Sequence, residues 1–373
     1  MTAKPIGLYV HIPICKRKCN YCDFCSYRES DADWREEYID ALCREIKSYQ
    51  GKGIAVDTLF IGGGTPSLLS ASELSLIIHC IDECFDLSDD LEFTLEANPG
   101  AINQNTLSEF VALGVNRLSI GLQSIHENEM KILGRIHSFE DFKELDRFAR
   151  ECGVKNINVD LMYGIPEQTI DSLNETLDEI IKLSPEHISL YGLILEEGTP
   201  FYEMKDRLPI PDEDTECDMY FLSANRLRAA GYSHYEISNY SRVGLECRHN
   251  LKYWRNQEYI GFGVAAYSYF EGKRSGNSRN ISEYLSDCRT KYLKEETVDS
   301  ENEAYEYVML RLRLSEGFLL SDYFARFGKD FLMGREETVK RFVNAGYIKL
   351  CDGRISLTES GFYVSNTILT ELI

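Results

Sequence analysis

The stretch YVHIPICKRKCNYCDFC, residues 9–25, begins as a short apolar segment and continues into a loop that carries four cysteines. The apolar part, GLYVHI at residues 7–12, predicts a buried strand. Cys15, Cys19 and Cys22 follow it with the spacing C-x3-C-x2-C, and Cys25 comes next. Because a third of the chain's 12 cysteines lie on this one loop, the pattern favours a metal site over isolated thiols.

Short apolar segments of the same kind recur along the first half of the chain, and amphipathic stretches lie between them. The further candidate strands are 57–62, 92–97, 117–121, 156–162 and 187–193. Helical spacing of apolar residues marks 34–46 and 173–181 as two of the intervening helices. Alternating strands and helices predict the α/β class, with a parallel sheet curved into a partial (β/α)6 barrel like that of triosephosphate isomerase.

Residues with unusual chemistry follow these strands at their C-terminal ends. The cysteine loop follows the first strand, GGGTP (62–66) the second and EANPG (96–100) the third. The later strands lead to Gln123, Asp160 and LILEEGTP (193–200). Since barrels of this kind place their chemistry at that end, we expect these residues to surround one site.

The pattern divides the chain into three parts. Residues 1–195 form the predicted barrel core, and residues 196–299 form a less regular extension that contains HNLKYW (249–254). Residues 300–373 predict helices followed by a hairpin, IKLCDGRISL, with Asp-Gly at its turn. This arrangement resembles a winged-helix domain. Winged helices usually bind DNA, but these residues carry no basic excess, so a packing or docking role is favoured.

The chain of 373 residues has a formal net charge of −21, which disfavours nucleic acids and anionic membranes as partners. No run approaches the ~18 apolar residues that a membrane-spanning helix needs. The N-terminal apolar stretch lacks a small-residue cleavage site and is interpreted as a strand, not a signal peptide. We therefore expect a cytoplasmic protein whose thiols stay reduced, without an integral membrane segment.

Three thiolates on one loop can ligate three irons of a 4Fe-4S cluster and leave the fourth iron open. That iron can take the amino and carboxylate groups of S-adenosylmethionine (SAM), and an electron donor for the cluster would then be a partner. Cys25 is not a ligand in this scheme, because filling the open position would block SAM. A zinc site would want four closed ligands, and no second cysteine pair accompanies the first.

The stretches YVHIPICKRKCNYCDF, GGGTP, EANPG, GLQS and DLMYGIPEQ together resemble a radical SAM protein of the coproporphyrinogen-oxidase-like family. The resemblance runs in order to about residue 270, and the tail resembles that family's C-terminal domain. It implies a 4Fe-4S cluster on Cys15, Cys19 and Cys22. The residues that it implies for SAM are Tyr9, Gly63, Gly64, Thr65, Glu96, Gln123, Arg135, Asp160 and Ile194.

Roles follow from the same resemblance. Gly63, Gly64 and Thr65 would line the methionyl group of SAM. Glu96 would accept a hydrogen bond from its amino group, and Arg135 would pair with its carboxylate. Gln123 and Asp160 would hold the ribose hydroxyls. The backbone of Ile194 would contact the adenine, and Tyr9 would lie beside the cluster.

Two features separate the branches of this family. The oxidases carry a further cysteine two positions after the third cluster ligand, where this chain has Phe24. The CDF pattern and HNLKYW resemble instead the heme chaperone (HemW-type) branch. There His249 is a candidate iron ligand, Cys247 is its rival, and Tyr253 and Trp254 offer flat surface to a porphyrin. Alternatively, His249 satisfies backbone groups while the aromatic side chains pack.

The favoured function is a heme chaperone that binds heme, a 4Fe-4S cluster and SAM and transfers heme to acceptor proteins. The alternative is an oxygen-independent coproporphyrinogen III oxidase, which forms protoporphyrinogen IX by radical decarboxylation. Two further hypotheses are another radical SAM reaction on a tetrapyrrole, such as anaerobic heme breakdown, and a structural metal module. Whether the chain is an enzyme is left open, and no catalytic residue is assigned.

Overall fold

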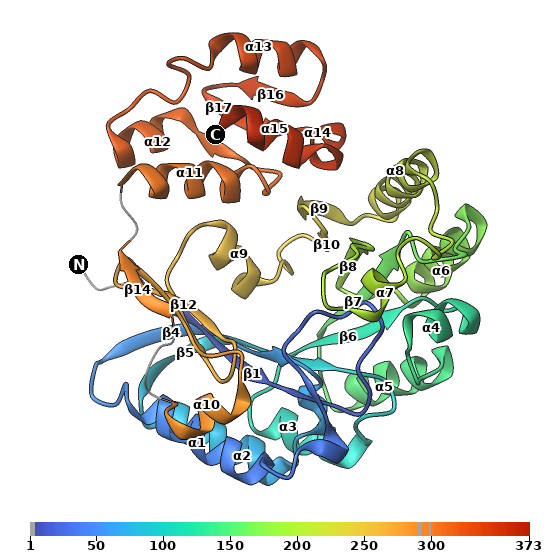
Figure 1. The fold of residues 1–373 in the computed structure, drawn as a ribbon, viewed down its shortest axis with the longest axis vertical. Coiled ribbons are helices and arrows are strands. Elements are labelled where there is room, and N and C mark those ends of the chain that lie inside the picture. Colours follow the sequence, from blue (N-terminus) through green and yellow to red (C-terminus); the bar gives the residue numbers. More distant parts are fainter. Residues whose placement is uncertain (1–3, 289–292, 298–299) are drawn as a thin grey trace.

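The computed structural model describes residues 4–288, 293–297 and 300–373. Figure 1 shows an open barrel of strands with helices on its outer side, and a smaller C-terminal group of helices above it. The predicted boundaries between the three parts of the chain remain predictions, and the one at residue 299 falls outside the described residues.

Six parallel strands form the barrel and pair in the order of the sequence. They are β1 (Ile6–Ile12), β4 (Ile54–Gly63), β5 (Phe85–Ala97), β6 (Arg117–Gln123), β7 (Asn156–Tyr163) and β8 (His187–Gly192). The predicted α/β class and the partial barrel are confirmed. All six candidate strands exist, although β4 and β5 begin earlier than the apolar pattern indicates.

Helices cover the outer side of this sheet (Figure 1). They are α1 (Arg35–Lys47), α2 (Ala71–Asp82), α3 (Gln104–Ala112), α4 (Glu127–Leu133), α5 (Phe139–Glu151) and α6 (Ile170–Leu183), with short 3-10 turns at Glu29–Asp31 and Pro66–Leu68. Ser70, Ser138 and Thr169 begin α2, α5 and α6 with capping boxes, which supply acceptors for N–H groups that lack partners within the helix. Cys80 and Cys84 are buried in the core.

The extension adds strands to both edges of the barrel sheet. β11 (Tyr259–Phe262) pairs parallel with β1, and β12 (Tyr267–Phe270), β13 (Lys273–Gly276) and β14 (Leu293–Thr297) continue that edge antiparallel. At the other edge, β10 (Asn239–Ser241) and β9 (Ser233–Glu236) follow β8. β9 and β10 therefore form a hairpin. The helices of this part are α7 (Pro200–Glu203), α8 (Glu213–Ala229), α9 (Arg248–Trp254) and α10 (Ile281–Ser286).

The C-terminal part contains α11 (Ser300–Arg311), α12 (Leu320–Phe327), α13 (Glu336–Asn344), α14 (Glu359–Tyr363) and α15 (Ser365–Leu372) around a sheet of β15 (Phe318–Leu319), β17 (Arg354–Leu357) and β16 (Ile348–Cys351). Asp352 and Gly353 join the hairpin with φ of 52° and 71°, as a tight Asp-Gly turn requires. The hydrophobic cluster of this part is separate from that of the barrel and includes Tyr220 of the extension. The winged-helix-like prediction is confirmed.

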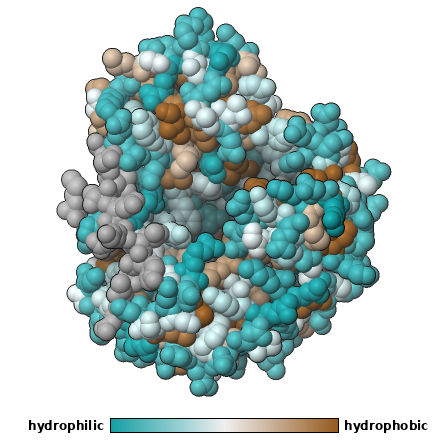
Figure 2. All heavy atoms as spheres, viewed as in Figure 1, coloured by the Kyte–Doolittle hydropathy of each residue, from teal (hydrophilic) through white to brown (hydrophobic). Residues whose placement is uncertain are grey.

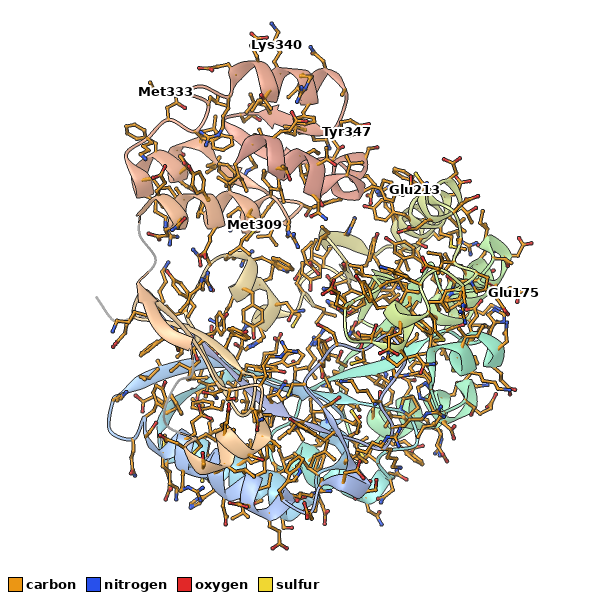
Figure 3. All side chains as sticks on the ribbon, viewed as in Figure 1. Glu175, Glu213, Met309, Met333, Lys340 and Tyr347 are labelled. Carbon is orange, nitrogen blue, oxygen red and sulfur yellow. The ribbon has the colours of Figure 1, made fainter. Side chains whose placement is uncertain are left out.

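Contacts tie this C-terminal domain to the barrel. Figure 3 shows Met309 on the side of α11 that faces α9. Glu359 accepts hydrogen bonds from Tyr220 Oη at 3.1 Å and His234 Nδ1 at 2.9 Å, and it pairs with Arg228. One carboxylate of α14 is therefore held by three groups from the extension.

Hydrophilic residues cover most of the face seen in Figure 2. Among the described residues, no helix is both long enough and apolar enough to cross a membrane.

Candidate functional site

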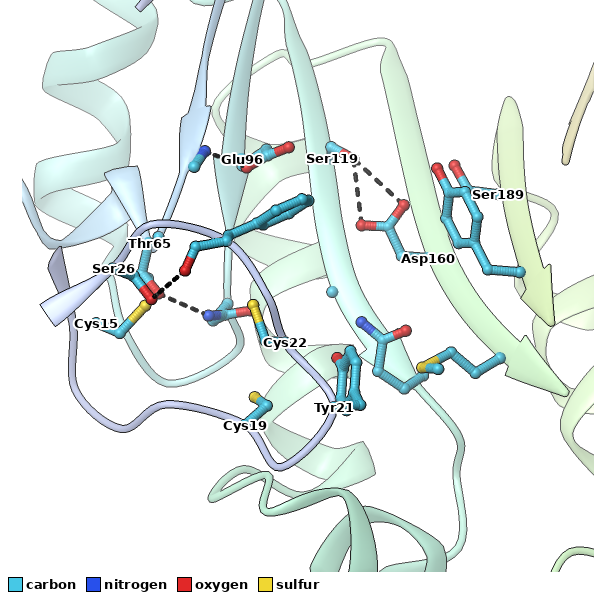
Figure 4. A pocket seen from close by; sticks show the side chains of 18 of the residues that line it. Cys15, Cys19, Tyr21, Cys22, Ser26, Thr65, Glu96, Ser119, Asp160 and Ser189 are labelled. Atoms are coloured by element: carbon cyan, nitrogen blue, oxygen red, sulfur yellow. Dashed lines mark hydrogen bonds between the residues drawn. The ribbon is translucent and has the colours of Figure 1, made fainter. Parts of the chain in front are cut away.

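A cavity of about 500 Å³ lies inside the barrel and reaches the C-terminal ends of its strands. It brings together every residue that the sequence nominates for the cluster and for SAM. They are Tyr9, Cys15, Cys19, Cys22, Gly63, Gly64, Thr65, Glu96, Gln123, Arg135, Asp160 and Ile194. Figure 4 shows the cysteine loop at one side of this cavity, Glu96 on β5 and Asp160 on β7.

The cysteine loop is fixed at its ends and its middle. Its ends pair as β2 (Ile14–Cys15) and β3 (Tyr27–Arg28). His11 Nε2 donates to the carbonyl of Cys25 at 2.8 Å, which leaves Nδ1 to accept from Tyr9 Oη at 2.9 Å. At the middle, Asn20 donates to the carbonyls of Leu133 and Ile132 at the C-terminal end of α4 at 2.9 and 2.8 Å. The loop is therefore positioned by the barrel.

The three nominated thiols lie near hydrogen-bond donors. Thr65 Oγ1 donates to Cys15 Sγ at 3.6 Å, and Arg135 Nη1 donates to Cys19 Sγ at 3.5 Å. Burial raises the pKa of Cys15, and it raises the pKa of Cys22 to about 11. Cys15 and Cys22 are therefore neutral at pH 7 in the protein alone, and binding of a metal cation favours their thiolate forms.

The fourth cysteine of the loop lies apart from the cavity. Cys25 Sγ donates to the carbonyl of Arg279 at 3.3 Å. Among the described residues, those that line the cavity do not include Cys25. Its position agrees with the expectation that it does not complete the cluster.

Two glycines of the GGGTP turn, Gly63 and Gly64, have no room for a side chain. Gly63 has a φ of 113°, and a Cβ there would lie 2.6 Å from the His11 ring. A Cβ on Gly64 would lie 2.6 Å from the carbonyl of Ile14. Glycine at these positions lets the backbone approach the cysteine loop and the cavity closely.

Two carboxylates face the cavity and form no ion pair within the described part of the chain. Glu96 accepts a hydrogen bond from the N–H of Gly63 at 2.9 Å. Desolvation, with repulsion from Asp160, nevertheless raises the pKa of Glu96 to about 7. Desolvation also raises the pKa of Asp160, which accepts from Asn158 Nδ2 at 2.7 Å. A bound cation would stabilise the ionised form of both groups.

Arg135 lies between the cysteine loop and the strand ends. Its Nη2 donates to Asn98 Oδ1 at 2.9 Å and to the carbonyl of Gly121, while its Nε has no hydrogen-bond partner among the described residues. Beside it, Gln123 adopts a left-handed φ of 75°. Strain of this kind is concentrated at binding sites, so both residues agree with a ligand site here.

Helix α9 closes the other end of the cavity. His249, Asn250 and Tyr253 line it. His249 contacts Thr58 of β4, which precedes Gly63 by five residues and so lies roughly 16 Å from it along the strand. Burial, with Lys252 and Arg117 nearby, lowers the pKa of His249 to about 3. The imidazole is therefore neutral at pH 7, the form that binds metals.

The other two heme candidates lie outside the lining of the cavity in the described part of the chain. Cys247 is fully buried, and its thiol points to Glu92 Oε1 at 3.7 Å. Trp254 lies near the Arg313 guanidinium, 5.8 Å away, on the side of the C-terminal domain. The structure thus brings together two of the four residues nominated for heme.

Sequence reasoning missed several residues of the cavity. Examples are Tyr21, Phe60, Asn98, Arg117 and Tyr191. Two of these carry a signal in the sequence: Asn98 lies within EANPG, and Arg117 is a charge at the start of a buried strand, two positions before Ser119 and on the same face. Tyr21 and Phe60 carry none, because their neighbours in the sequence do not reveal what faces them.

Comparison with known proteins agrees with this geometry. Residues 9–180 match the radical SAM superfamily, and residues 298–364 match the HemN C-terminal domain. The chain is 33% identical to the heme chaperone HemW of Lactococcus lactis, over 100% of this chain and 98% of that protein. It is 35% identical to HemW of Bacillus subtilis, over 96% and 97%, and 34% identical to HemW of Escherichia coli, over 98% and 97%.

A solved structure shares the fold over nearly the whole chain. Coproporphyrinogen III oxidase (HemN) from Escherichia coli superposes with a TM-score of 0.86 at 22% identity, over 99% of this chain and 90% of that one. At this level of identity the likeness shows the fold alone.

Proposed function

The chain belongs to the HemW family of radical SAM proteins, and from that premise we propose that it binds heme, a 4Fe-4S cluster and SAM and delivers the heme to acceptor proteins. The observation that carries the proposal is a single cavity with three loop thiols at one end and His249 with Tyr253 at the other. Sequence identity of 33–34% over nearly the full length of relatives named as heme chaperones supports the proposal.

The residues fit a cluster that keeps one iron open. Cys15, Cys19 and Cys22 would hold it, because they line the cavity on one anchored loop, whereas Cys25 points away. When bound, the cluster supplies an electron that can cleave the sulfonium of SAM. An electron donor is therefore a proposed partner.

The remaining polar groups fit SAM. Glu96 would accept a hydrogen bond from the amino group through its ionised carboxylate. Arg135 would bind the carboxylate through Nε, the donor without a partner among the residues that the structure describes. Gln123 and Asp160 would hold the ribose, and the backbone of Ile194 would contact the adenine. Gly63, Gly64 and Thr65 would let the methionyl group pass close to the chain, beside Tyr9.

For heme, the geometry favours His249 over Cys247. Only the histidine lines the cavity, and its low pKa keeps it neutral and able to bind iron. Tyr253 is the aromatic surface for the porphyrin, and Trp254 is assigned to packing against the C-terminal domain. The function requires acceptor proteins and a cytoplasmic supply of heme, and it requires no nucleic acid.

The second candidate is oxygen-independent coproporphyrinogen III oxidation. The match of residues 298–364 to the HemN C-terminal domain favours it. Against it stands Phe24, which is 56% exposed at the position where the oxidases carry a further cysteine. A phenylalanine there supplies neither a thiol nor a proton.

A heme titration tests the proposed function. Purified, anaerobically reconstituted protein should bind one heme per chain with a shifted Soret band. His249→Ala should lose that shift, and Cys247→Ala should keep it. Iron and sulfide content of each variant controls for an intact cluster. Absence of a Soret shift in the wild-type protein would overturn the proposal.

A further inference from the structure

His249 is enclosed on several sides. Its Nδ1 lies 2.9 Å from Thr58 Oγ1, and its Nε2 lies 2.8 Å from Tyr253 Oη. The ring of Phe60 lies against it with centroids 5.3 Å apart and planes tilted by 31°. On the side of β1, a Cβ on Gly7 would come within 3.1 Å of His249 Cε1 and 3.0 Å of Thr58 Oγ1. The ring is therefore held in one orientation.

The backbone of His249 is held as well. Glu92 Oε1 accepts the N–H of His249 at 3.0 Å, and Glu92 Oε2 accepts the N–H of Arg248 at 3.0 Å. Both hydrogen bonds lie at the start of α9, where N–H groups lack partners within the helix. The helix therefore presents its histidine from a fixed base.

The two ring nitrogens of His249 face different surroundings. Thr58 is fully buried, and it is not part of the cavity lining among the described residues. Tyr253 lines the cavity and lies one turn further along the same helix. Nδ1 therefore points into the protein, and Nε2 points toward the side that a ligand can reach.

We propose that Thr58 is a positioning residue for heme ligation: it holds Nδ1 of His249, so that Nε2 is the nitrogen offered to iron, and Tyr253 covers Nε2 until heme binds. The inference rests on the proposed function. With iron on Nε2, the ring proton would reside on Nδ1, and this N–H would donate a hydrogen bond to Thr58 Oγ1. Metal-bound histidines usually donate their second N–H to an acceptor in the protein, which fixes the tautomer and the orientation of the ring.

The two contacts act in opposite directions. Tyr253 competes with iron for Nε2, so its hydroxyl must leave before ligation. Thr58 supports the ligated form, so its hydroxyl stays. Removing each hydroxyl while keeping the shape of the side chain should therefore change heme binding with opposite signs.

The test measures heme binding by the full-length, reconstituted protein with Tyr253→Phe, Thr58→Val and Thr58→Ser. Tyr253→Phe keeps the ring and should bind heme about two- to tenfold more tightly, the range for one hydrogen bond that no longer competes. Thr58→Val should bind about two- to tenfold more weakly. Its ferric electron paramagnetic resonance signal should also shift, because the axial imidazole loses its partner, and Thr58→Ser should restore both.

The outcomes separate this inference from the function on which it rests. No heme binding by the wild-type protein would overturn the function. Heme binding lost in His249→Ala but unchanged in both Tyr253→Phe and Thr58→Val would overturn the positioning role alone. If Thr58→Val unfolds, as its circular dichroism would reveal, Thr58→Ser and Tyr253→Phe decide: weaker binding by Tyr253→Phe contradicts the inference.

Discussion

Glu96 should make SAM binding depend on pH. Burial and Asp160 raise the pKa of its carboxyl to about 7 in the protein without ligand. The amino group of SAM donates its N–H to the ionised form of Glu96, so binding near neutral pH must release a proton from Glu96. Affinity should therefore rise with pH until Glu96 is ionised.

The size of the effect follows from this pKa. With a value of about 7, about one tenth of the Glu96 carboxyls are ionised at pH 6 and about nine tenths at pH 8. SAM should therefore bind about tenfold more weakly at pH 6 than at pH 8. Stability changes in the opposite sense. The folded protein keeps a proton that the unfolded chain loses above 4.5, the ordinary pKa, so this carboxyl lowers stability by about 3 kcal/mol as pH rises from 4.5 to beyond 7.

Isothermal titration calorimetry on the reconstituted protein at pH 6, 7 and 8 measures the affinity for SAM. Titration in two buffers of different ionisation enthalpy counts the protons released. Glu96→Gln cannot ionise and should bind SAM weakly with little pH dependence between 6 and 8. Equal affinity at pH 6 and 8 in the wild-type protein, or an equal slope in Glu96→Gln, would refute the reasoning.

Three further predictions concern the loop, helix α9 and the C-terminal domain. Cys25→Ser should keep the iron and sulfide content of the reconstituted protein, whereas Cys22→Ser should lose most of it; equal losses would contradict the assigned ligand set. Glu92→Gln should lower the free energy of local opening at the His249 amide by about 1–2 kcal/mol, measured by hydrogen exchange, because one backbone N–H loses its acceptor. Glu359→Ala should destabilise docking of the C-terminal domain by about 2 kcal/mol and speed limited proteolysis there; unchanged cleavage would count against that contact.

Much of the barrel could be predicted because its strands are apolar and end in chemical motifs. The beginning of β5 could not be predicted, because Phe85 to Asp90 includes polar, partly exposed residues without the pattern of a buried strand. These residues belong to the strand because its first residues pair with the start of β4. The hairpin of β9 and β10 was missed for a similar reason. Its short strands carry no turn signal stronger than Ser-Asn.

The candidate site was predictable where one motif supplies both residue type and place, as for the cysteine loop and the glycine turn. Partnerships between distant segments were not. Nothing in the sequence around Thr58 indicates that it faces His249, and nothing near Cys247 distinguishes its buried thiol from a ligand. These contacts depend on where α9 packs against β1 and β4, which only the fold decides.

One anaerobic experiment tests the central claim most directly. The reconstituted protein is incubated with SAM, a reductant, coproporphyrinogen III, heme and an apo-protein acceptor, and both tetrapyrroles are followed. We expect heme to reach the acceptor faster than it does without the protein, and His249→Ala to abolish that gain, with no protoporphyrinogen formed. Conversion of coproporphyrinogen III to protoporphyrinogen IX without accelerated heme transfer would contradict the account.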